Sequence, residues 1–512
     1  MTEPVHTWAD VDGHLEIDCD VCIIGSGAGG SVLAAGLAAH GHDVVVLEAG
    51  GNFTRADFHG DESVAYPRMY QERGARASAE VGITVLQGRT VGGGTTVNWT
   101  TCFRTPDRIL ERWAEVHGVR GWSPSDLAPH FDAVEDRLGI ATWDASRANA
   151  NNKVLLDGCE ALGWQVDPLR RNVRGCVNSG QCGTGCPIDA KQGMAITYLA
   201  DARENGARVY AGARVDTLIV EGDRVAGASV TMHDPTTDQP TGATMTVRAR
   251  RTVSSAGAIN GPALLIRSGL DRAPLGRRTM LHPVVALPAL YDRPINGFYG
   301  APQSISSHEF VDRGADRVGY FLETPPLQPM LAASGSTIFG RSQQEFMRQL
   351  PNIGVLIALS IDGLVDGDEG GVVTLRNDGR IHLDYPVRPA LVEAFRDAHR
   401  SMARIALAAG ATQVQSTHLD PVVVTSEADI ARFDDAPFGL LEHSIFTAHQ
   451  MGGCAMGDDP ARSVVSSELA HHDVDDLYVV DGSVFPTALG VNPSETIYGI
   501  AHRAVDILHA TL

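Results

Sequence analysis

The residues best suited to chemistry in the first fifty positions are a cluster of glycines and one acid. Gly25-Ser26-Gly27-Ala28-Gly29-Gly30 follows a short apolar run, and Glu48 lies 23 residues after Gly25. In a dinucleotide fold the first glycine allows a tight turn, the second lets the backbone approach a pyrophosphate, and the third lets helix and strand pack closely. The acid accepts a hydrogen bond from a ribose 2′-hydroxyl, which favours NAD or FAD over NADP.

The elements that must position these residues can be predicted from the hydrophobic pattern. Two apolar runs, 21–24 and 44–47, flank a segment of small residues that ends at His40. This order predicts strand, glycine turn, helix and strand, which is a βαβ unit. The N-terminus of the helix would present unpaired N–H groups and a partial positive charge to the pyrophosphate.

A second helix is predicted near the C-terminus, from Pro493 to about Leu508. Asn492 is a good N-cap residue, and Pro493 suits the first helical position because it has no N–H to leave unpaired. The positive end of this helix would stabilise negative charge on a bound group. In the simplest alternative, Asn492 only caps the helix.

A second glycine-rich stretch extends from Gly88 to Asn98, with three consecutive glycines at 92–94. Such a turn provides either flexibility or close approach to a flat or anionic group. Residues 254–270 show a further strand end, glycine turn and short helix, again suited to a phosphate.

Together these motifs resemble those of the glucose–methanol–choline (GMC) family of flavin oxidoreductases. The family has a GRxxGGSSxxN stretch where this chain has Gly88–Asn98, with Gly94 and Thr95 replacing the serines. Residues 254–270 resemble its second signature, with Gly261 and Asp271 as departures. The resemblance spans nearly the whole chain. It implies FAD as the cofactor, held without a covalent bond because no histidine lies between Gly88 and Phe103.

The resemblance also implies the catalytic residues. His449 begins the stretch HQMGGCAMG, which resembles the family's HPxGTCxMG with Gln450 in place of proline. The resemblance assigns His449 as the base that takes a proton from a substrate hydroxyl, and Asn492 as a donor to the same oxygen. Hydride would then pass to flavin N5. An imidazole with its ordinary pKa of about 6.5 suits such a base, and a structural histidine is the alternative.

The predicted cofactor-binding residues come from the motifs and from the resemblance. Val215 is included because the family places a backbone group of this strand against the adenine, although a core valine is nearly as well supported. No metal-binding residue is assigned. The full set is Gly25, Ser26, Gly27, Ala28, Gly29, Gly30, Glu48, Ala49, Arg89, Gly92, Gly93, Thr95, Asn98, Val215, Ala256, Gly257, Asp481, Gly482, Asn492, Pro493 and Thr496.

Three cysteines, Cys176, Cys182 and Cys186, lie close together in a loop that lacks the CxxC spacing of a zinc site. Three hypotheses remain open: a structural loop of reduced thiols, a 3Fe-4S cluster held by three thiolates, or a redox disulfide. The stretch Cys176–Lys191 resembles a CxxxGxCxxGCPxxAK loop of the long-chain alcohol oxidase branch. Sugar dehydrogenases of the same family that hold a 3Fe-4S cluster have an extra cysteine where this chain has Val177.

We therefore expect FAD-dependent oxidation of an alcohol, hydrophobic and long-chain or alicyclic, with O2 or another electron acceptor. The alternatives are a sugar or sterol dehydrogenase with an iron–sulfur relay, and a non-redox lyase or photoenzyme of the family. An NAD-dependent dehydrogenase would explain the first glycine motif but would have no role for residues 88–98 or Asn492.

Composition limits the other classes of function. The chain has 512 residues and a formal net charge of −21 at pH 7, which argues against nucleic acid and anionic lipid as partners. We expect no membrane span and no secretory signal, and hence a cytoplasmic protein. The expected fold is mixed α/β, a Rossmann-like FAD-binding domain intertwined with a substrate domain built on an antiparallel sheet backed by helices. The predicted ranges are 15–107, 190–285 and 440–512 for the FAD-binding domain, and 108–189 and 286–439 for the substrate-binding or cap domain.

Overall fold

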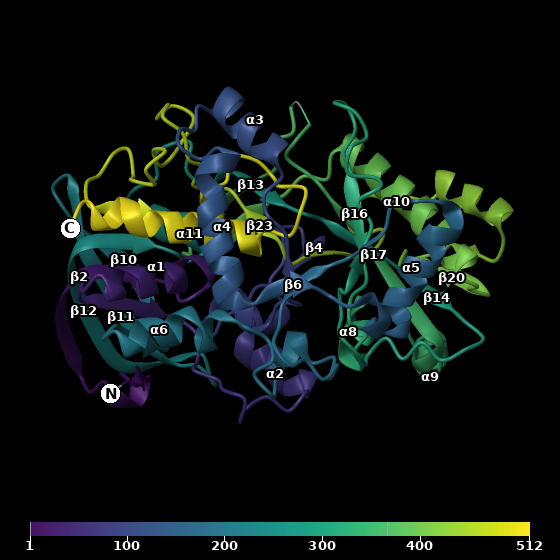
Figure 1. Cartoon of the computed structure of the whole chain (residues 1–512), viewed down its shortest axis with the longest axis horizontal. Coiled ribbons are helices and arrows are strands. Elements are labelled where there is room, and N and C mark those ends of the chain that lie inside the picture. Colours follow the sequence, from purple (N-terminus) through teal and green to yellow (C-terminus); the bar gives the residue numbers. More distant parts are fainter. Residues whose placement is uncertain (1, 366) are drawn as a thin grey trace.

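The fold was obtained as a computed structural model that describes residues 2–365 and 367–512. Two sheets, each with its own helices, form the two halves of the molecule, and both termini lie in the half at the left of Figure 1. The left half has a largely parallel sheet and the right half an antiparallel sheet backed by helices. The fold class expected from the sequence is confirmed.

The sheet of the left half has eight strands, and its parallel part contains the predicted βαβ unit. Apolar side chains fill both faces of the two strands on either side of the glycine turn, as is usual in parallel sheets. An antiparallel extension of two strands widens the sheet at one edge. In spatial order the strands are β1 (Val5–His6), β9 (Arg208–Ala211), β3 (Val44–Glu48), β2 (His14–Ile24), β12 (Gln239–Ser254), β11 (Arg224–Asp234) and β10 (Ala213–Glu221), with β24 (Leu477–Val479) also paired to β12.

The helices of the left half pack side by side. α1 (Ala28–Ala39) lies between α6 (Tyr198–Glu204) and α11 (Ser494–His509), and α4 (Pro124–Leu138) crosses in front of them. The small residues of α1 allow this close packing: a Cβ on Gly36 would lie 2.3 Å from Val505 of α11. The helix that follows the first glycine motif is therefore packed against the last helix of the chain.

The sequence pattern of residues 209–215 predicts one strand, and this prediction is wrong in detail. The run 209–215 is two strands, because Gly212 has a φ of +72° and breaks the chain between β9 and β10. Only glycine fits at this position, because a Cβ on Gly212 would lie 2.4 Å from the carbonyl oxygen of His233.

The sheet of the right half has seven strands, and two helices pack against it. α10 (Pro389–Ala408) and α5 (Ala150–Leu162) contact each other and the central strands. In spatial order the strands are β16 (Tyr320–Glu323), β17 (Ile353–Ser360), β14 (Val284–Leu290), β20 (Gln413–Gln415) and β21 (Val423–Val424), with β22 (Ile445–Thr447) and β4 (Ile83–Val85) joined to β14.

Smaller elements join the halves. A four-stranded sheet has the order β19 (Ile381–Asp384), β18 (Gly371–Leu375), β13 (Arg277–Leu281) and β23 (Gln450–Met451). A three-stranded sheet has β5 (Thr101–Cys102), β8 (Arg170–Asn172) and β6 (Ile140–Thr142), and β15 (Ile305–Ser306) pairs with β7 (Asp167–Pro168). The remaining α-helices are α2 (Glu62–Met69), α3 (Asp107–His117), α7 (Asn260–Arg267), α8 (Pro329–Gly335) and α9 (Arg341–Arg348).

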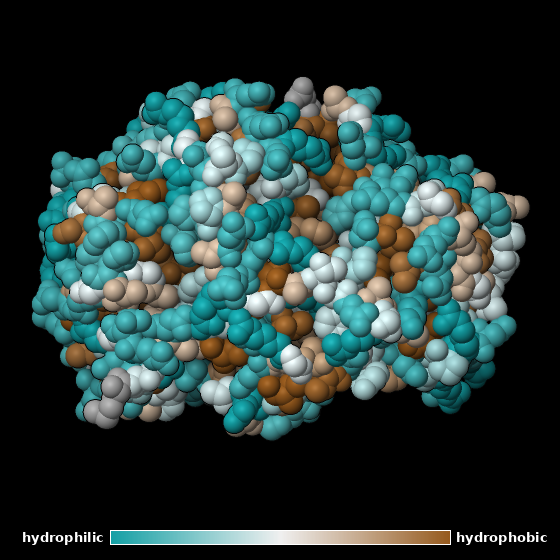
Figure 2. All heavy atoms as spheres, in the orientation of Figure 1, coloured by the Kyte–Doolittle hydropathy of each residue, from teal (hydrophilic) through white to brown (hydrophobic). Residues whose placement is uncertain are grey.

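The surface is mainly polar on the face shown in Figure 2, with small hydrophobic patches scattered among polar residues, one of them at the lower edge around α2. Within residues 2–365 and 367–512, none of the helices combines the length and the hydrophobicity that crossing a membrane requires.

Candidate active site

A cavity of about 840 Å³ lies where the glycine motifs, the N-terminus of α11 and strands of both halves meet. Its size lies in the range of small-molecule and cofactor sites. His449 and Asn492 line the same cavity as Gly25, Gly27 and Glu48. The structure therefore brings the predicted catalytic pair and the first dinucleotide motif to one site, although they are more than 400 positions apart in sequence.

Most of the predicted cofactor residues line this cavity. Ser26, Gly30, Gly92 and Thr496 do not. Ser26 Oγ instead donates to Glu48 Oε2 at 2.6 Å and accepts from Gly92 N at 3.0 Å, so it joins the two glycine motifs. Those that line the cavity are Gly25, Gly27, Ala28, Gly29, Glu48, Ala49, Arg89, Gly93, Thr95, Asn98, Val215, Ala256, Gly257, Asp481, Gly482, Asn492 and Pro493.

The other residues of the predicted set that lie off the cavity have packing roles. A Cβ on Gly30 would lie 2.0 Å from the carbonyl oxygen of Gly25, so Gly30 allows the tight turn between strand and helix. Thr496 Oγ1 lies 2.8 Å from Thr105 Oγ1 in a buried contact behind α11.

Glu48 is buried at the end of β3. One oxygen accepts from the N–H and hydroxyl of Ser26, and the other accepts from Gly50 N at 2.8 Å. Burial raises the pKa of this carboxyl, although those hydrogen bonds oppose the shift. The contacts fix the carboxyl at the cavity wall, where the family resemblance places a ribose.

The glycine motifs form a surface to which a flat or anionic group can come close. A Cβ on Gly93 would lie 2.6 Å from the Cα of Gly27, so the two loops close against each other. Beside them, Asn98 Oδ1 is buried on the cavity wall without a hydrogen-bond partner. An unpaired acceptor on a cofactor-sized cavity fits a ligand with N–H or O–H donors, which FAD has on its flavin ring and its ribityl chain.

The helix α11 begins one residue later than predicted, with Ser494 as its first residue and Pro493 as the N-cap. Asn492 is therefore not the N-cap, and its side chain makes no capping hydrogen bond. It turns instead towards His449 and Glu323, at 3.3 Å and 3.5 Å from Nδ2. The reading of Asn492 as only a helix cap is wrong.

His449 follows β22, where its backbone N–H donates to Thr447 Oγ1 at 3.2 Å. Its ring contacts two side chains: Nε2 lies 3.3 Å from Asn492 Nδ2, and Nδ1 lies 3.0 Å from Nδ1 of His282. Because the Asn492 amide is a donor, His449 Nε2 acts as the acceptor. The proton of His449 then lies on Nδ1 and is donated to His282. This tautomer keeps Nε2 unprotonated, as a base requires, with its lone pair accepting from Asn492 at the cavity wall.

The two histidines are neutral in the folded protein. Burial lowers the pKa of His449 to about 3 and lowers that of His282 well below its ordinary value. The sequence suggested the ordinary pKa of about 6.5 for His449; the buried environment gives a weaker resting base that stays unprotonated over the whole neutral range.

Glu323, like His282, is a site residue that the sequence analysis missed. It is the last residue of β16, fully buried, and it does not itself line the cavity. Its Oε2 accepts from Gln303 Nε2 at 2.5 Å and from Asn492, and Thr101 Oγ1 donates to Gln303 Oε1 at 2.9 Å. Burial raises the pKa of Glu323 to about 8, although the two hydrogen bonds oppose this. The only feature of the sequence that could have indicated Glu323 is its position as a single acid at the end of an apolar strand.

The pH dependence of stability should report on Glu323. Between about pH 4.5 and pH 8 the unfolded chain has lost this proton while the folded chain keeps it, so this carboxyl lowers stability as pH rises. Each pKa unit is worth about 1.4 kcal/mol. We expect Glu323→Gln, which keeps the neutral form, to gain thermal midpoint relative to wild type steadily from pH 5 to pH 8.5. Parallel midpoint curves would show that Glu323 is not the titrating group.

The cavity wall near His449 and Asn492 is mostly apolar. Trp99 and Ile497 line it from the left half, and four residues come from strands of the right half. Polar side chains also line the cavity here, among them Gln303, Thr101, Gln450 and Ser494. The four residues of the right half are Val284, Ile357, Leu359 and Phe446.

The cysteine loop supports the wall of this cavity that residues 96–98 form. Lys191 Nζ is buried and donates to the carbonyl oxygens of Thr96, Asn98 and Cys182, at 2.5, 3.1 and 2.7 Å. Burial lowers the pKa of Lys191 to about 8. The loop is thereby tied to the segment that follows the three glycines.

Neither a cluster nor a disulfide is supported for the cysteine loop. Over residues 2–365 and 367–512 no three His, Cys, Asp or Glu side chains are arranged to hold a metal ion, and all cysteines are unpaired. Burial raises the pKa of the Cys182 thiol, which disfavours a thiolate there. The contacts favour a structural loop of reduced thiols.

Fold and site together define a dinucleotide-binding oxidoreductase. Models of the GMC oxidoreductase family match residues 66–284 and 368–501, and a model of an NAD(P)-binding Rossmann-like domain matches residues 23–80. The chain belongs to the GMC oxidoreductase family and is an FAD-dependent enzyme acting on CH–OH donors.

Relatives and solved structures extend this result. The long-chain-alcohol oxidase FAO4B of Arabidopsis thaliana is 31% identical, over 98% of this chain and 69% of that protein. An uncharacterized GMC-type oxidoreductase of Mycobacterium tuberculosis is 32% identical, over 95% of this chain and 75% of that protein. The crystal structure of pyridoxine 4-oxidase from Mesorbium loti superposes with a TM-score of 0.70 at 22% identity, covering 96% and 99% of the two chains.

Proposed function

We propose that the protein oxidises a hydrophobic alcohol, long-chain or alicyclic, to the aldehyde or ketone, with His449 as the base. The observation that carries the proposal is the pair of His449 Nε2 and Asn492 Nδ2, 3.3 Å apart on the wall of the cofactor-sized cavity. A hydroxyl oxygen placed between them can donate its proton to Nε2 while it accepts from Nδ2. When bound, FAD supplies the acceptor for the hydride at its N5 atom.

Each residue of the site has a separate task. His282 holds the His449 ring through Nδ1 and fixes the tautomer that leaves Nε2 free. Asn492 stabilises the oxygen as negative charge develops on it. Glu323 orients the Asn492 amide, and in its ionised form it would favour the imidazolium that His449 becomes.

The apolar wall supports a hydrophobic substrate. Val284, Ile357, Leu359 and Phe446 offer no hydrogen bonds to a sugar, whereas an alkyl chain would be desolvated against them. Relatives named as long-chain-alcohol oxidases agree with this choice. O2 or another acceptor would reoxidise the flavin.

The test is anaerobic titration of the FAD-loaded protein with a series of primary alcohols, followed through bleaching of the flavin. Each buried methylene is worth about 0.8 kcal/mol, so we expect kred/Kd to rise about fourfold per methylene until the chain fills the pocket. Phe446→Ala should reduce this gain for dodecanol but leave ethanol unchanged. Admission of air then separates an oxidase, which recovers its colour promptly, from a dehydrogenase.

Two results would overturn the proposal. Bleaching by glucose in preference to every alkyl alcohol would identify a sugar dehydrogenase. A flavin that no alcohol reduces would place the protein among the lyases or photoenzymes of its family.

A further inference from the structure

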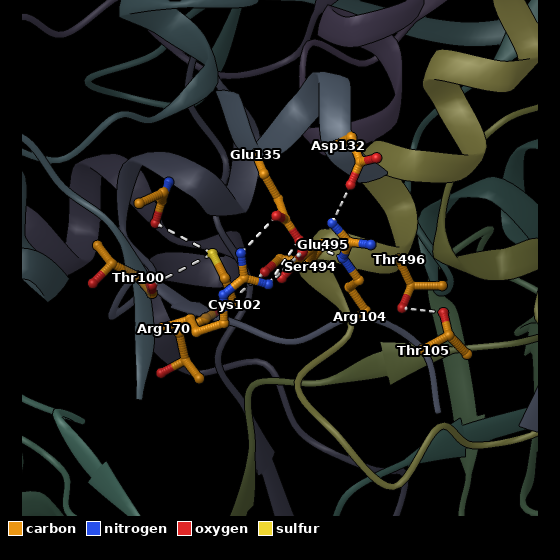
Figure 3. Close-up of polar contacts among 12 residues, drawn as sticks. Thr100, Cys102, Arg104, Thr105, Asp132, Glu135, Arg170, Ser494, Glu495 and Thr496 are labelled. Atoms are coloured by element: carbon orange, nitrogen blue, oxygen red, sulfur yellow. Dashed lines mark hydrogen bonds and ion pairs between the residues drawn. The ribbon is translucent and has the colours of Figure 1, made fainter. Parts of the chain in front are cut away.

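The first turn of α11 contains a buried carboxyl with no counter-charge of its own (Figure 3). Glu495 is 0% exposed, and neither of its oxygens accepts a hydrogen bond. The nearest cation is Arg170, whose NH1 lies 3.6 Å from Oε1. An ionised carboxylate in this position would have lost its hydration without gaining hydrogen bonds, which is costly.

The surrounding charges are already balanced. Glu135 of α4 is bound by Arg104, from Nε at 2.5 Å, and by Arg170, from NH2 at 2.6 Å. Arg104 also pairs with Asp132 at 2.6 Å. Two guanidinium groups therefore face two carboxylates, and an ionised Glu495 would add a negative charge that nothing offsets.

Glu495 and Glu135 meet at one guanidinium group: NH1 of Arg170 lies 2.7 Å from Glu135 Oε1 and 3.6 Å from Glu495 Oε1. Burial raises the pKa of Glu495, and its contact with the Glu135 carboxyl raises it further. Burial also acts to raise the pKa of Glu135, but the hydrogen bonds from Arg170 and Arg104 outweigh it and hold that pKa well below its ordinary range. The proton therefore resides on Glu495, while Glu135 stays ionised between the two arginines.

Glu495 lies at the N-terminus of α11 beside the cavity, so its protonation state affects the charge there. Asn492, Pro493 and Ser494 line the cavity, and Glu495 is the next residue. The N-terminus of a helix carries about half a positive charge, and a carboxylate in the first turn would partly cancel it.

We propose that Glu495 is held as a neutral acid by sharing its proton with Glu135, and that it thereby leaves the positive end of α11 free to stabilise negative charge on the flavin. Glu495 is a positioning residue for charge and does not touch substrate. The inference rests on the flavin and not on the choice of alcohol. The titratable and charged groups around it are Glu135 and Asp132 of α4, Arg170 of β8, Arg104, Cys102 of β5 and Tyr498 of α11.

The test measures how tightly the oxidised holoenzyme binds sulfite, which adds to the flavin and leaves negative charge on the ring. Three variants are compared with wild type: Glu495→Gln, Glu135→Gln and the double variant. In wild type we expect sulfite affinity to fall as pH rises and Glu495 ionises. In Glu495→Gln the sulfite affinity should not fall with rising pH, and at neutral pH it should equal that of wild type.

The variant Glu135→Gln should make Glu495 ionise, whereas Glu495→Gln removes its ability to ionise. Without the Glu135 carboxylate, Glu495 becomes the natural partner of Arg104 and Arg170 and ionises at neutral pH. Sulfite binding should then weaken about three- to thirtyfold, which corresponds to the range of helix-terminus charge effects. The double variant should restore it, because no carboxylate remains in the first turn.

Two outcomes would overturn the inference. One is that the sulfite affinity of Glu495→Gln falls with rising pH as much as that of wild type. The other is a sulfite affinity of Glu135→Gln within twofold of that of wild type. This second measurement remains valid even if Glu495→Gln fails to retain FAD. Neither uses an alcohol, so failure here is separate from failure of the proposed substrate.

Discussion

The variant His449→Ala should retain FAD but lose its reduction by alcohol, with the rate of flavin bleaching falling by about 10²- to 10⁴-fold, the usual contribution of a general base. The reason is geometric. Nε2 of His449 is unprotonated at the cavity wall beside Asn492 Nδ2, and its neighbour His282 is fully buried and shielded from the substrate. The measurement is anaerobic stopped-flow reduction with saturating alcohol.

Two controls show whether the lost activity is due to proton transfer. Reduction of His449→Ala by dithionite should match wild type, which shows that the flavin itself is intact. Asn492→Ala should lose less activity, in the range of a single hydrogen-bond donor to a developing oxyanion, about 10²-fold. Alcohol reduction of His449→Ala at near wild-type rate would exclude His449 as the base.

The second large effect concerns two glycines of the same motif, which should fail in different ways. A Cβ on Gly29 would lie 2.0 Å from the carbonyl oxygen of Val480, whereas a Cβ on Gly27 would meet nothing closer than 3.9 Å. Gly29→Ala must therefore shift backbone, and we expect a loss of more than about 3 kcal/mol of stability. Gly27→Ala should fold normally but bind FAD at least about tenfold more weakly, because its methyl group faces the cavity that the pyrophosphate must enter.

Thermal unfolding of the apoproteins and fluorescence titration with FAD separate the two effects. The backbone at Gly27, with φ −74° and ψ −158°, is accessible to alanine, so strain does not confuse the comparison. A Gly27→Ala protein that binds FAD as tightly as wild type would show that the pyrophosphate lies elsewhere. An unchanged midpoint for Gly29→Ala would show that α1 and Val480 can move apart.

The features that sequence predicted well are local ones. The strand, turn and helix around Gly25 follow from residues within one short segment, and the expected fold class followed from them and from the family resemblance. Asn377-Asp378-Gly379-Arg380 is a good hairpin turn signal between two apolar runs. The structure has this hairpin between β18 and β19, because turn chemistry is set by adjacent residues.

The features that sequence could not supply depend on long-range packing. Glu323 contacts Asn492 across 169 positions, and nothing in β16 marks its acid as part of the site. The pKa of His449 falls because the folded chain buries it, which no motif records. The N-cap at 492 was wrong because that side chain bonds to His449 and Glu323 instead of its own helix.

The pairing of β24 with β12 in the large sheet has a consequence for biosynthesis. β24 and the start of α11 complete a cavity whose glycine turn was made about 450 residues earlier. At 5–20 residues per second, roughly 20 to 90 seconds separate the two on the ribosome. FAD thus meets a complete binding site only after the segment from β24 to the start of α11 has been made, and until then a nascent chain must protect the apolar strands around Gly25 without its cofactor.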